Sequence, residues 1–376
     1  MEIVENFING KVLSFSNDLL PVINPATGEQ IKSVINSGQK DFEEAVASAI
    51  DSQKRWSKTT PLKRSRVLSS YKNILENNLV NLAEVISKEH GKTIEDAKGS
   101  LIRGIEVVEF ASGIPHLLKG EFSQNVGTDI DSWSMRQPLG VCAGITPFNF
   151  PAMVPMWMFP MAIACGNTFV LKPSEKDPSC PLKLAELFSE AGLPDGVLNV
   201  VNGDKEVVDA ILEHKDISAV SFVGSTPIAK YIYENAAKNE KRVQALGGAK
   251  NHCVVMPDCD LDQAVNGLMG AAYGSAGERC MAQSVAVAVG GIGDKLVESL
   301  AKKVEALKVG PGMDKLSEMG PLVTKEHLAK VKGYVDIGEK EGAKLIVDGR
   351  DFKLQGYENG YYIGGCLFDH VKKHMR

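Results

Sequence analysis

The chain has 376 residues, of which 44% are hydrophobic and 24% are charged, as in an ordinary globular protein of two or three domains. Its net charge of −5 gives no basic character that would favour nucleic acid, so nucleic-acid binding is not expected. The seven cysteines are scattered without CxxC spacing, which predicts reduced thiols in the cytoplasm or in an organelle matrix. The N-terminal segment carries acids and lacks an apolar core, so no secretory signal is expected.

Residues 7–36 are predicted to form short strands and turns, and helices are expected from residue 41 to residue 118. The first helix is expected to be capped by Asp41, with Glu44 three residues later as in a capping box. Apolar residues at helical spacing follow these two acids. In residues 121–137 polar residues alternate with apolar ones, which predicts a β-hairpin that projects from its domain.

No residue between Arg136 and Lys172 is charged, and this stretch is long enough to raise the question of a membrane span. Five prolines and three glycines interrupt it. We therefore expect a buried strand, a loop, a buried helix and a second strand, and no contact with a membrane.

From residue 138 to residue 246, short apolar strands alternate with helices. This alternation predicts a fold of the α/β class with a parallel, doubly wound sheet. Such a sheet binds its ligands at the carboxyl ends of its strands. The alternation restarts near residue 248, which predicts a second α/β domain in the remainder of the chain.

Cys280 lies in a loop between a predicted helix at 261–273 and a predicted strand at 285–289. Small neighbouring residues would leave room for a substrate to reach the sulfur. The guanidinium of Arg279 would favour the thiolate, which is the nucleophilic form of cysteine. Taken alone, the same pattern also fits a buried and inert cysteine, which is the usual role of this residue in a core.

Three loops after predicted strands are candidates for binding a ligand. Gly224 would let the backbone approach a phosphate and Ser225 offers a hydroxyl at a helix N-terminus, although a simple helix cap explains both. Lys172 and Glu175 suit ribose or phosphate, but they also suit a solvated turn. Asn149 is an amide between prolines and aromatic residues, and it could hold an oxyanion or bond to its own turn.

The remaining patterns are weaker. A partial GxG motif at residues 291–293 lacks the third glycine of a dinucleotide-binding loop. His370 and His374 lie four residues apart, and His252, Cys253, Asp258 and Cys259 form a second candidate set, but neither group has a standard ligand spacing. No metal site is therefore expected.

Taken together, several segments resemble the aldehyde dehydrogenase superfamily in order and spacing across nearly the whole chain. The segments are residues 147–151, 172–175, 222–226, 248–251 and 277–280. Within the superfamily, residues 103–104, 248–252, 279–282, 361–365 and 367–370 are most similar to the CoA-acylating methylmalonate-semialdehyde dehydrogenases. The resemblance implies a discontinuous NAD-binding domain at 1–118 and 138–247, an oligomerisation hairpin at 119–137 and a catalytic domain at 248–376.

The resemblance also implies roles for single residues. Cys280 would attack the aldehyde, and Asn149 together with the backbone N–H of Cys280 would hold the oxyanion. The positions that match the family's NAD site are Thr146, Phe148, Lys172, Glu175, Lys176, Gly224, Ser225 and Gly247. Glu175 beside the adenosine ribose would repel a 2′-phosphate, so NAD is expected rather than NADP.

Hydrolytic members of the superfamily carry a glutamate four residues before the lysine that Lys250 matches, and this glutamate activates water. Counting back from Lys250 gives Leu246, and neither Gln244 nor Ala245 is a carboxylate. Without a general base, attack by water should be slow, whereas the thiol of coenzyme A needs less activation. The missing acid therefore favours acyl transfer to coenzyme A.

Arg279 and Arg103 match positions that clamp a substrate carboxylate in this group, and a guanidinium suits that task. Ordinary ion pairs are the alternative for both. A malonyl-type thioester can lose CO₂ through an enolate. The expected reaction is therefore the oxidation of methylmalonate semialdehyde to propionyl-CoA, or of malonate semialdehyde to acetyl-CoA. The resemblance also implies a homo-oligomer (dimer or tetramer).

The chain ends at Arg376, before the Glu-Ile-Phe-Gly-Pro segment of the family, so a C-terminal truncation is expected. Two alternatives to the acylating enzyme remain at this point. One is a hydrolytic NAD-dependent dehydrogenase for another aldehyde. The other is an inactive fragment that only binds nucleotide.

Overall fold

The computed structural model describes all 376 residues, and the chain divides into two compact units. Unit 1 consists of Met1–Val22, Lys32–Leu82 and Lys98–Gly247. Unit 2 consists of Ile23–Ile31, Ala83–Ala97 and Gly248–Arg376. Two short N-terminal segments therefore belong to the unit that contains the Cys280 loop.

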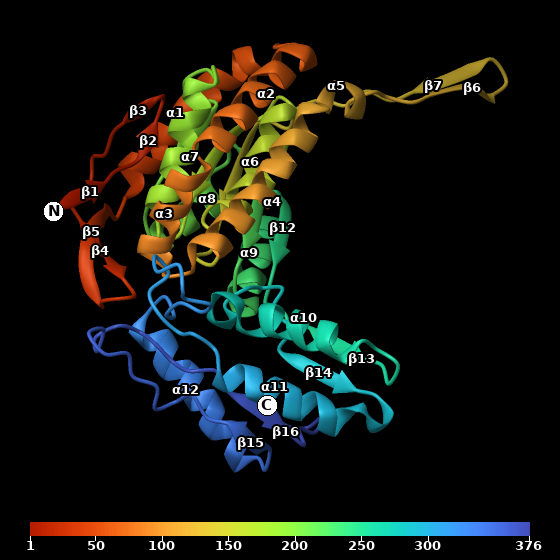
Figure 1. The fold of residues 1–376 in the computed structure, drawn as a ribbon. Helices are drawn as coiled ribbons and strands as arrows, with labels where there is room; N and C mark the ends of the chain where they lie inside the picture. The colour runs from red at the N-terminus through yellow and green to blue at the C-terminus, as the bar shows by residue number, and fades with distance from the viewer. The chain divides into compact units, whose positions relative to one another are not determined.

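A seven-stranded sheet forms the centre of unit 1 (Figure 1), in the order β12-β11-β8-β9-β10-β2-β3. Its strands are β2 (Phe7–Ile8), β3 (Lys11–Val12), β8 (Val141–Ile145), β9 (Thr168–Lys172), β10 (Leu198–Val200), β11 (Ile217–Val223) and β12 (Arg242–Leu246). The last five strands are parallel, and β2 and β3 add an antiparallel edge beside β10. The predicted parallel, doubly wound sheet is confirmed.

The order of the strands locates the switch point of this sheet. From β8 the chain proceeds to β9 and β10 on one side, and then returns to β11 and β12 on the other side. The direction of winding therefore reverses between β8 and β11. In a doubly wound sheet, the crevice for a ligand opens at the carboxyl ends of the two strands that flank this point.

Helices cover both faces of the sheet. They are α1 (Gln39–Trp56), α2 (Pro61–Asn77), α4 (Ile94–Ser112), α5 (Ile114–Leu117), α6 (Met153–Ala164), α7 (Ser179–Glu190), α8 (Lys205–Glu213) and α9 (Thr226–Lys238). Val170 of β9 packs in one apolar cluster with residues of α1, α8 and α9. The preceding residue, Phe169, points to the opposite face, where its ring and Met158 of α6 both approach Gly144.

The uncharged stretch forms β8, a loop, α6 and β9, as predicted. Helix α6 has only 12 residues. It carries apolar side chains on all sides because it is buried against the sheet and α2. No helix of the structure has both the length and the apolar character needed to cross a membrane.

The prediction that Asp41 caps the first helix is wrong. Helix α1 begins at Gln39 after Gly38, and no side chain caps it. Asp41 is only 1% exposed, and its Oδ1 accepts hydrogen bonds from Asn6 Nδ2 at 3.1 Å and from Phe15 N at 2.7 Å. The carboxylate is used to hold the N-terminal segment against the helix, so a distant contact overrides the local capping pattern.

The predicted hairpin is present as β6 (Phe122–Gly127) and β7 (Ile130–Trp133), which pair in antiparallel fashion. Figure 1 shows it as a long ribbon beyond α5 that leaves the other elements of unit 1. Four apolar side chains of this ribbon are between 57% and 67% exposed. They are Phe122, Val126, Ile130 and Trp133.

Near the N-terminus, β1 (Glu2–Val4), β5 (Glu29–Ile35) and β4 (Leu19–Asn24) form a small separate sheet.

Unit 2 is a second α/β arrangement, as predicted. Its elements are α3 (Leu79–His90, from residue 83 on), β13 (His252–Val255), α10 (Leu261–Tyr273), β14 (Val285–Ala288), α11 (Gly293–Glu305), α12 (Lys325–Lys340), β15 (Lys344–Val347) and β16 (Leu367–Asp369). Strands β13 and β14 are parallel, and β15 and β16 are antiparallel. The apolar faces of α10 and α11 pack on Val255 of β13.

Backbone contacts explain why two N-terminal segments belong to unit 2. Tyr361 N donates to Pro25 O at 2.9 Å, and Ile94 N donates to Gly312 O at 3.1 Å. Gly312 and Gly320 lie so close to the turn after α3 that a Cβ on either would fall about 2.1 Å from a carbonyl oxygen of that turn. Segments 23–31 and 83–97 thereby line the C-terminal part of the chain.

Candidate active site

The residues predicted for the nucleotide site gather at one edge of the unit 1 sheet. Thr146, Phe148 and Asn149 follow β8; Lys172 ends β9, with Glu175 and Lys176 just after it; Gly224 and Ser225 follow β11; and Gly247 follows β12. Because these four strands are parallel neighbours, their carboxyl ends meet at this edge. The sequence therefore places these residues around the switch point, where a doubly wound sheet binds its ligand.

Thr146 is buried at this edge of the sheet. The residue is 5% exposed, and its backbone N donates to Lys172 O at 3.1 Å. Its buried hydroxyl, however, has no hydrogen-bond partner in the structure. Buried polar groups in proteins are normally hydrogen-bonded, so this hydroxyl remains available to a ligand at the sheet edge.

The charges that follow β9 do not form a solvated turn. Lys172 is 5% exposed, and its Nζ lies 3.3 Å from Glu175 Oε2. Burial lowers the pKa of Lys172, although Glu175 opposes the shift. Burial alone would raise the pKa of Glu175, but Lys172 and Lys176 together hold it below its usual value. The carboxylate of Asp204 also acts on Lys172 and opposes the lowering of its pKa.

The structure also weakens the simple-cap explanation for Ser225. Helix α9 begins at Thr226, with Pro227 in its first turn, and the exposed Ser225 side chain makes no capping hydrogen bond. Its hydroxyl and the first N–H groups of α9 therefore remain suited to an anion, which the positive end of a helix attracts.

The Cys280 loop belongs to unit 2, whereas Asn149 belongs to unit 1. Asn149 lies partly buried in the turn between β8 and α6. A shared oxyanion site of Asn149 and Cys280 stays a prediction of the family resemblance. The same holds for the arginine clamp, because Arg103 lies exposed on α4 in unit 1 and Arg279 lies in unit 2.

The loop before Cys280 has an unusual backbone. Ser275 and Ala276 both have a φ of 52°, and Gly277 has a φ of 75°. Two consecutive non-glycine residues in the left-handed region are strained, and such a turn persists only where its surroundings hold it. Strained backbone of this kind is concentrated at functional sites in proteins.

Hydrogen bonds hold the loop on both sides of the cysteine. On one side, Ser275 N donates to Asp96 Oδ2 at 3.0 Å. On the other side, Asn251 Nδ2 donates to the carbonyl oxygens of Cys280 at 2.9 Å and Ala282 at 3.0 Å. The position of Cys280 is therefore set by distant segments rather than by the loop alone.

Cys280 differs from the buried cysteines of the chain. Cys142 is 6% exposed, and burial raises the pKa of its thiol to about 12, which makes it inert at neutral pH. Cys280 is only partly buried, and no disulfide forms in the chain. The interpretation of Cys280 as an inert core cysteine therefore loses its main support.

Arg279 forms an ion pair with Asp96, at the start of α4. Its Nη1 also donates to the carbonyl oxygen of Gly270 at 3.1 Å. The guanidinium thus has a defined place beside the nucleophile loop, with 26% of the side chain exposed.

Glu278 is a residue to which the sequence interpretation gave no role. Its side chain is 2% exposed, and Oε1 accepts a hydrogen bond from Val323 N at 3.2 Å. His90 Nε2 lies 3.9 Å from Oε2, and His327 Nε2 lies 3.6 Å from Oε1. The only feature of the sequence that could have indicated a role for Glu278 is its place inside the Gly277–Cys280 motif. Its partners are far away in the sequence, so no local pattern predicts them.

Burial favours the neutral forms of Glu278, His90 and His327. Burial raises the pKa of Glu278 to about 8, against the opposing effects of the Val323 hydrogen bond and the charge of Lys92. Burial lowers the pKa of His90, and Lys92 lowers it further. Burial and then Lys330 lower the pKa of His327. A protonated carboxyl and two neutral imidazoles therefore pack beneath the nucleophile loop.

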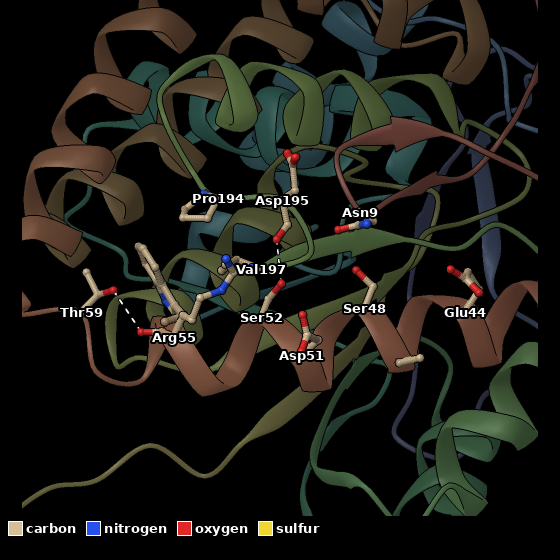
Figure 2. Close-up of a pocket in the computed structure, with 12 residues that line it drawn as sticks. Asn9, Glu44, Ser48, Asp51, Ser52, Arg55, Thr59, Pro194, Asp195 and Val197 are labelled. Atoms are coloured by element: carbon tan, nitrogen blue, oxygen red, sulfur yellow. Dashed lines mark hydrogen bonds between the residues drawn. The ribbon is translucent and has the colours of Figure 1, made fainter.

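A cavity of about 630 Å³ lies elsewhere in unit 1, along α1 (Figure 2). Polar and charged groups line it, among them Glu44, Asp51 and Asp195. Ser52 Oγ donates to Asp195 O at 2.7 Å, whereas the buried hydroxyl of Ser48 has no hydrogen-bond partner. The cavity borders the loop that precedes β10, so it lies at the amino end of that strand and contains none of the predicted site residues. It is therefore not the candidate active site.

Glu278→Gln tests the neutral cluster through the pH dependence of stability. The pKa of Glu278 is higher in the folded chain than in the unfolded one. Its contribution to stability is thus complete below about pH 4.5 and is lost as the pH rises to about 8. Glutamine retains an acceptor for Val323 N but does not titrate. We expect the wild-type Tm to fall, between pH 5 and pH 9, several degrees more than the Tm of the variant.

Differential scanning calorimetry at several pH values measures this difference. Glu305→Gln, which changes an exposed carboxylate on α11, is the control and should follow the wild type. Parallel Tm curves for the wild type and Glu278→Gln would show that Glu278 is not protonated in the folded chain.

Comparisons with known proteins agree with this geometry. A malonate-semialdehyde dehydrogenase of Pseudomonas aeruginosa is 56% identical over 376 residues, which cover 100% of this chain and 76% of that protein. Malonate-semialdehyde dehydrogenase 3 of Geobacillus kaustophilus is 54% identical, over 99% of this chain and 77% of that protein.

Solved structures give the same result. One from Sinorhizobium meliloti, described as a methylmalonate-semialdehyde dehydrogenase complexed with NAD, has a TM-score of 0.98 and 57% identity over 100% of this chain and 77% of its own. A methylmalonate-semialdehyde dehydrogenase from Oceanimonas doudoroffii has a TM-score of 0.98 and 56% identity, with the same coverage. The model of the aldehyde dehydrogenase family matches residues 13–376, and the chain therefore belongs to the aldehyde dehydrogenase family.

Proposed function

We propose that this chain catalyses the NAD-dependent, CoA-acylating oxidation of malonate semialdehyde or methylmalonate semialdehyde, with loss of CO₂. The names of the relatives at 50–56% identity support the substrate class. The observation that carries the proposal is the Cys280 loop. A partly exposed thiol follows a strained turn and the residue Arg279, while strand β12 offers no carboxylate to activate water.

The sheet edge of unit 1 suits NAD. The unsatisfied hydroxyl of Thr146, the ammonium of Lys172 and the uncapped start of α9 after Ser225 would receive the polar groups of the dinucleotide. Glu175 is held ionised by its two lysine neighbours, so it would repel the 2′-phosphate of NADP. When bound, NAD supplies the acceptor for the hydride that leaves the aldehyde carbon.

The residues of the chain would divide the chemistry as follows. The sulfur of Cys280 forms a bond to the aldehyde carbon, and the thiol proton is lost. Asn149 Nδ2 and the backbone N–H of Cys280 donate hydrogen bonds to the oxygen that becomes negative. Loss of the hydride leaves an acyl group on Cys280 as a thioester. The thiol of coenzyme A then takes this acyl group and releases the Cys280 sulfur as a thiolate.

Strand β12 explains why coenzyme A rather than water would be the acceptor. The residues before Gly247 are Gln244, Ala245 and Leu246, none of which can accept a proton from water at neutral pH. Coenzyme A carries its own thiol, whose thiolate is a strong nucleophile. The guanidinium of Arg279 would bind the carboxylate of the substrate until the C–C bond to it breaks and CO₂ leaves. The electron pair of that bond remains as a thioester enolate, which takes up a proton from solvent.

Steady-state turnover with and without coenzyme A tests the proposal. With malonate semialdehyde, NAD and coenzyme A, we expect sustained formation of NADH and of acetyl-CoA in equal amounts. Without coenzyme A, we expect at most about one NADH per Cys280, because the acyl group remains on the sulfur. Cys280→Ser should lower kcat about a thousandfold or more. Cys259→Ser, at another partly buried cysteine, should leave kcat unchanged.

Two results would replace the proposal with its alternatives. Equal turnover with and without coenzyme A would identify a hydrolytic aldehyde dehydrogenase. NAD binding without any formation of NADH from several aldehydes would identify a nucleotide-binding chain without activity.

We further propose that the β6–β7 hairpin pairs with a second copy of the chain. Its apolar side chains are exposed along a ribbon that no other element of unit 1 covers, and such a surface normally marks an interface. Light scattering after size exclusion should give a mass of two or more chains. The double variant Ile130→Ser, Trp133→Ser should give a smaller mass, and an unchanged mass would exclude the hairpin as the interface.

A further inference from the structure

Asp96 connects the two ends of the strained turn in the nucleophile loop. One carboxylate oxygen accepts a hydrogen bond from Ser275 N at 3.0 Å, and the other pairs with the guanidinium of Arg279. Ser275 and Arg279 lie on opposite sides of the left-handed residues at 276 and 277. A single carboxylate therefore fixes both the shape of the turn and the direction of the guanidinium beside Cys280.

Asp96 is itself held in place. It lies in the first turn of α4, where its backbone N donates to Thr93 Oγ1 at 3.2 Å. Carboxylates at a helix N-terminus are stabilised by the helix dipole. Both oxygens of Asp96 are occupied and its side chain is only 19% exposed, so Asp96 acts on Arg279 and is not placed to contact a substrate directly.

Gly274 leaves space for the guanidinium of Arg279 against the loop. Its φ of −53° and ψ of 134° are accessible to any residue, so its backbone conformation does not require glycine. A Cβ on Gly274 would, however, lie 2.6–2.7 Å from the Nη1, Nη2 and Cζ atoms of Arg279. The absence of a side chain at this position is what lets the guanidinium lie against the loop.

Some N–H donors of the guanidinium have no hydrogen-bond partner in the structure. Arg279 has five N–H donors, of which one serves Asp96 and one serves the Gly270 carbonyl oxygen. No other hydrogen bond of this side chain is present in the structure. The three remaining donors are sufficient for a bidentate pair with a second carboxylate.

We propose that Asp96 is a positioning residue for Arg279, and that it thereby makes the enzyme selective for aldehydes that carry a carboxylate two carbons from the carbonyl carbon. This inference rests on the proposed function. It adds to that function the contact that determines specificity, which involves Asp96 and the space above Gly274 rather than Arg279 alone.

Two variants disturb this arrangement in different ways. Asp96→Asn keeps the size of the side chain but offers only one acceptor oxygen, so it cannot serve both Ser275 and Arg279. Gly274→Ala leaves every charge in place and displaces only the guanidinium. Gly267→Ala is the matched control on α10, because a Cβ there has no atom within 4 Å.

The first readout is the ratio of kcat/KM for malonate semialdehyde to kcat/KM for propanal, which has a methyl group in place of the carboxylate. We expect Asp96→Asn and Gly274→Ala to lower this ratio about tenfold or more, and Gly267→Ala to leave it within about twofold. A merely structural role would lower both values together and leave the ratio unchanged, and that result would overturn the proposal.

The second readout does not require turnover. Iodoacetate and iodoacetamide alkylate the same thiol but differ in charge, and mass spectrometry of the Cys280 peptide gives both rates. A guanidinium held near the thiol favours the anionic reagent. The iodoacetate-to-iodoacetamide ratio should therefore fall several-fold in Asp96→Asn and Gly274→Ala but not in Gly267→Ala.

The two readouts separate this proposal from the proposed function. If the wild type oxidises no semialdehyde but the alkylation ratio falls in both variants, the role of Asp96 stands and the function does not. If the wild type prefers malonate semialdehyde and neither ratio changes in the variants, the function stands and the role of Asp96 is overturned. Melting curves confirm that each variant is folded.

Discussion

The left-handed turn at residues 275–277 is the constraint on which the candidate active site depends. Two non-glycine residues hold φ values of 52°, which an isolated peptide would not retain. The turn is stable because Asp96, Asn251 and the buried Glu278 attach the loop to three separate segments of unit 2. The strain and its restraints together fix the thiol of Cys280 instead of leaving it on a mobile loop.

Glu278 connects the Cys280 loop to residues that are distant in the sequence. A charged carboxylate is costly in a packed interior, and the nearby Lys92 offsets the effect of burial on the pKa of Glu278 only in part. The site accommodates it by keeping it protonated between two neutral histidines. The segments that carry these histidines, at the end of α3 and the start of α12, are thereby joined to the nucleophile loop. This pairing adds to the backbone contacts that attach residues 83–97 to unit 2.

Unit 1 follows a different principle. Its ligand edge results from the order of strands in a parallel sheet, which brings together the residues after β8, β9, β11 and β12. Thr146 and Lys172 are buried there, and the hydroxyl of Thr146 has no hydrogen-bond partner. Under the proposed function, Cys280 on its restrained loop in unit 2 would be the nucleophile, and the polar edge of unit 1 would bind the dinucleotide.

Much of this organisation could be predicted from the sequence, because it depends on local patterns. The alternation of strands and helices gave the sheet, and short motifs after strands located Thr146, Lys172 and Ser225 at its edge. Contacts between distant residues could not be predicted in this way. Asp41 was assigned to a helix cap but holds the N-terminal segment, and Asp96 was not recognised although it pairs with a residue 183 positions away. Strands β15 and β16 were also missed, since 19 residues separate two short segments that pair only in the folded chain.

The central claim is that Cys280 carries the substrate as a thioester, and this species can be observed directly. The chain is mixed with malonate semialdehyde and NAD in the absence of coenzyme A, quenched in acid, digested and analysed by mass spectrometry. We predict a malonyl group, or an acetyl group after loss of CO₂, on the Cys280 peptide and on no other cysteine, and its removal when coenzyme A is added before the quench. Formation of NADH with an unmodified Cys280 peptide would contradict the account.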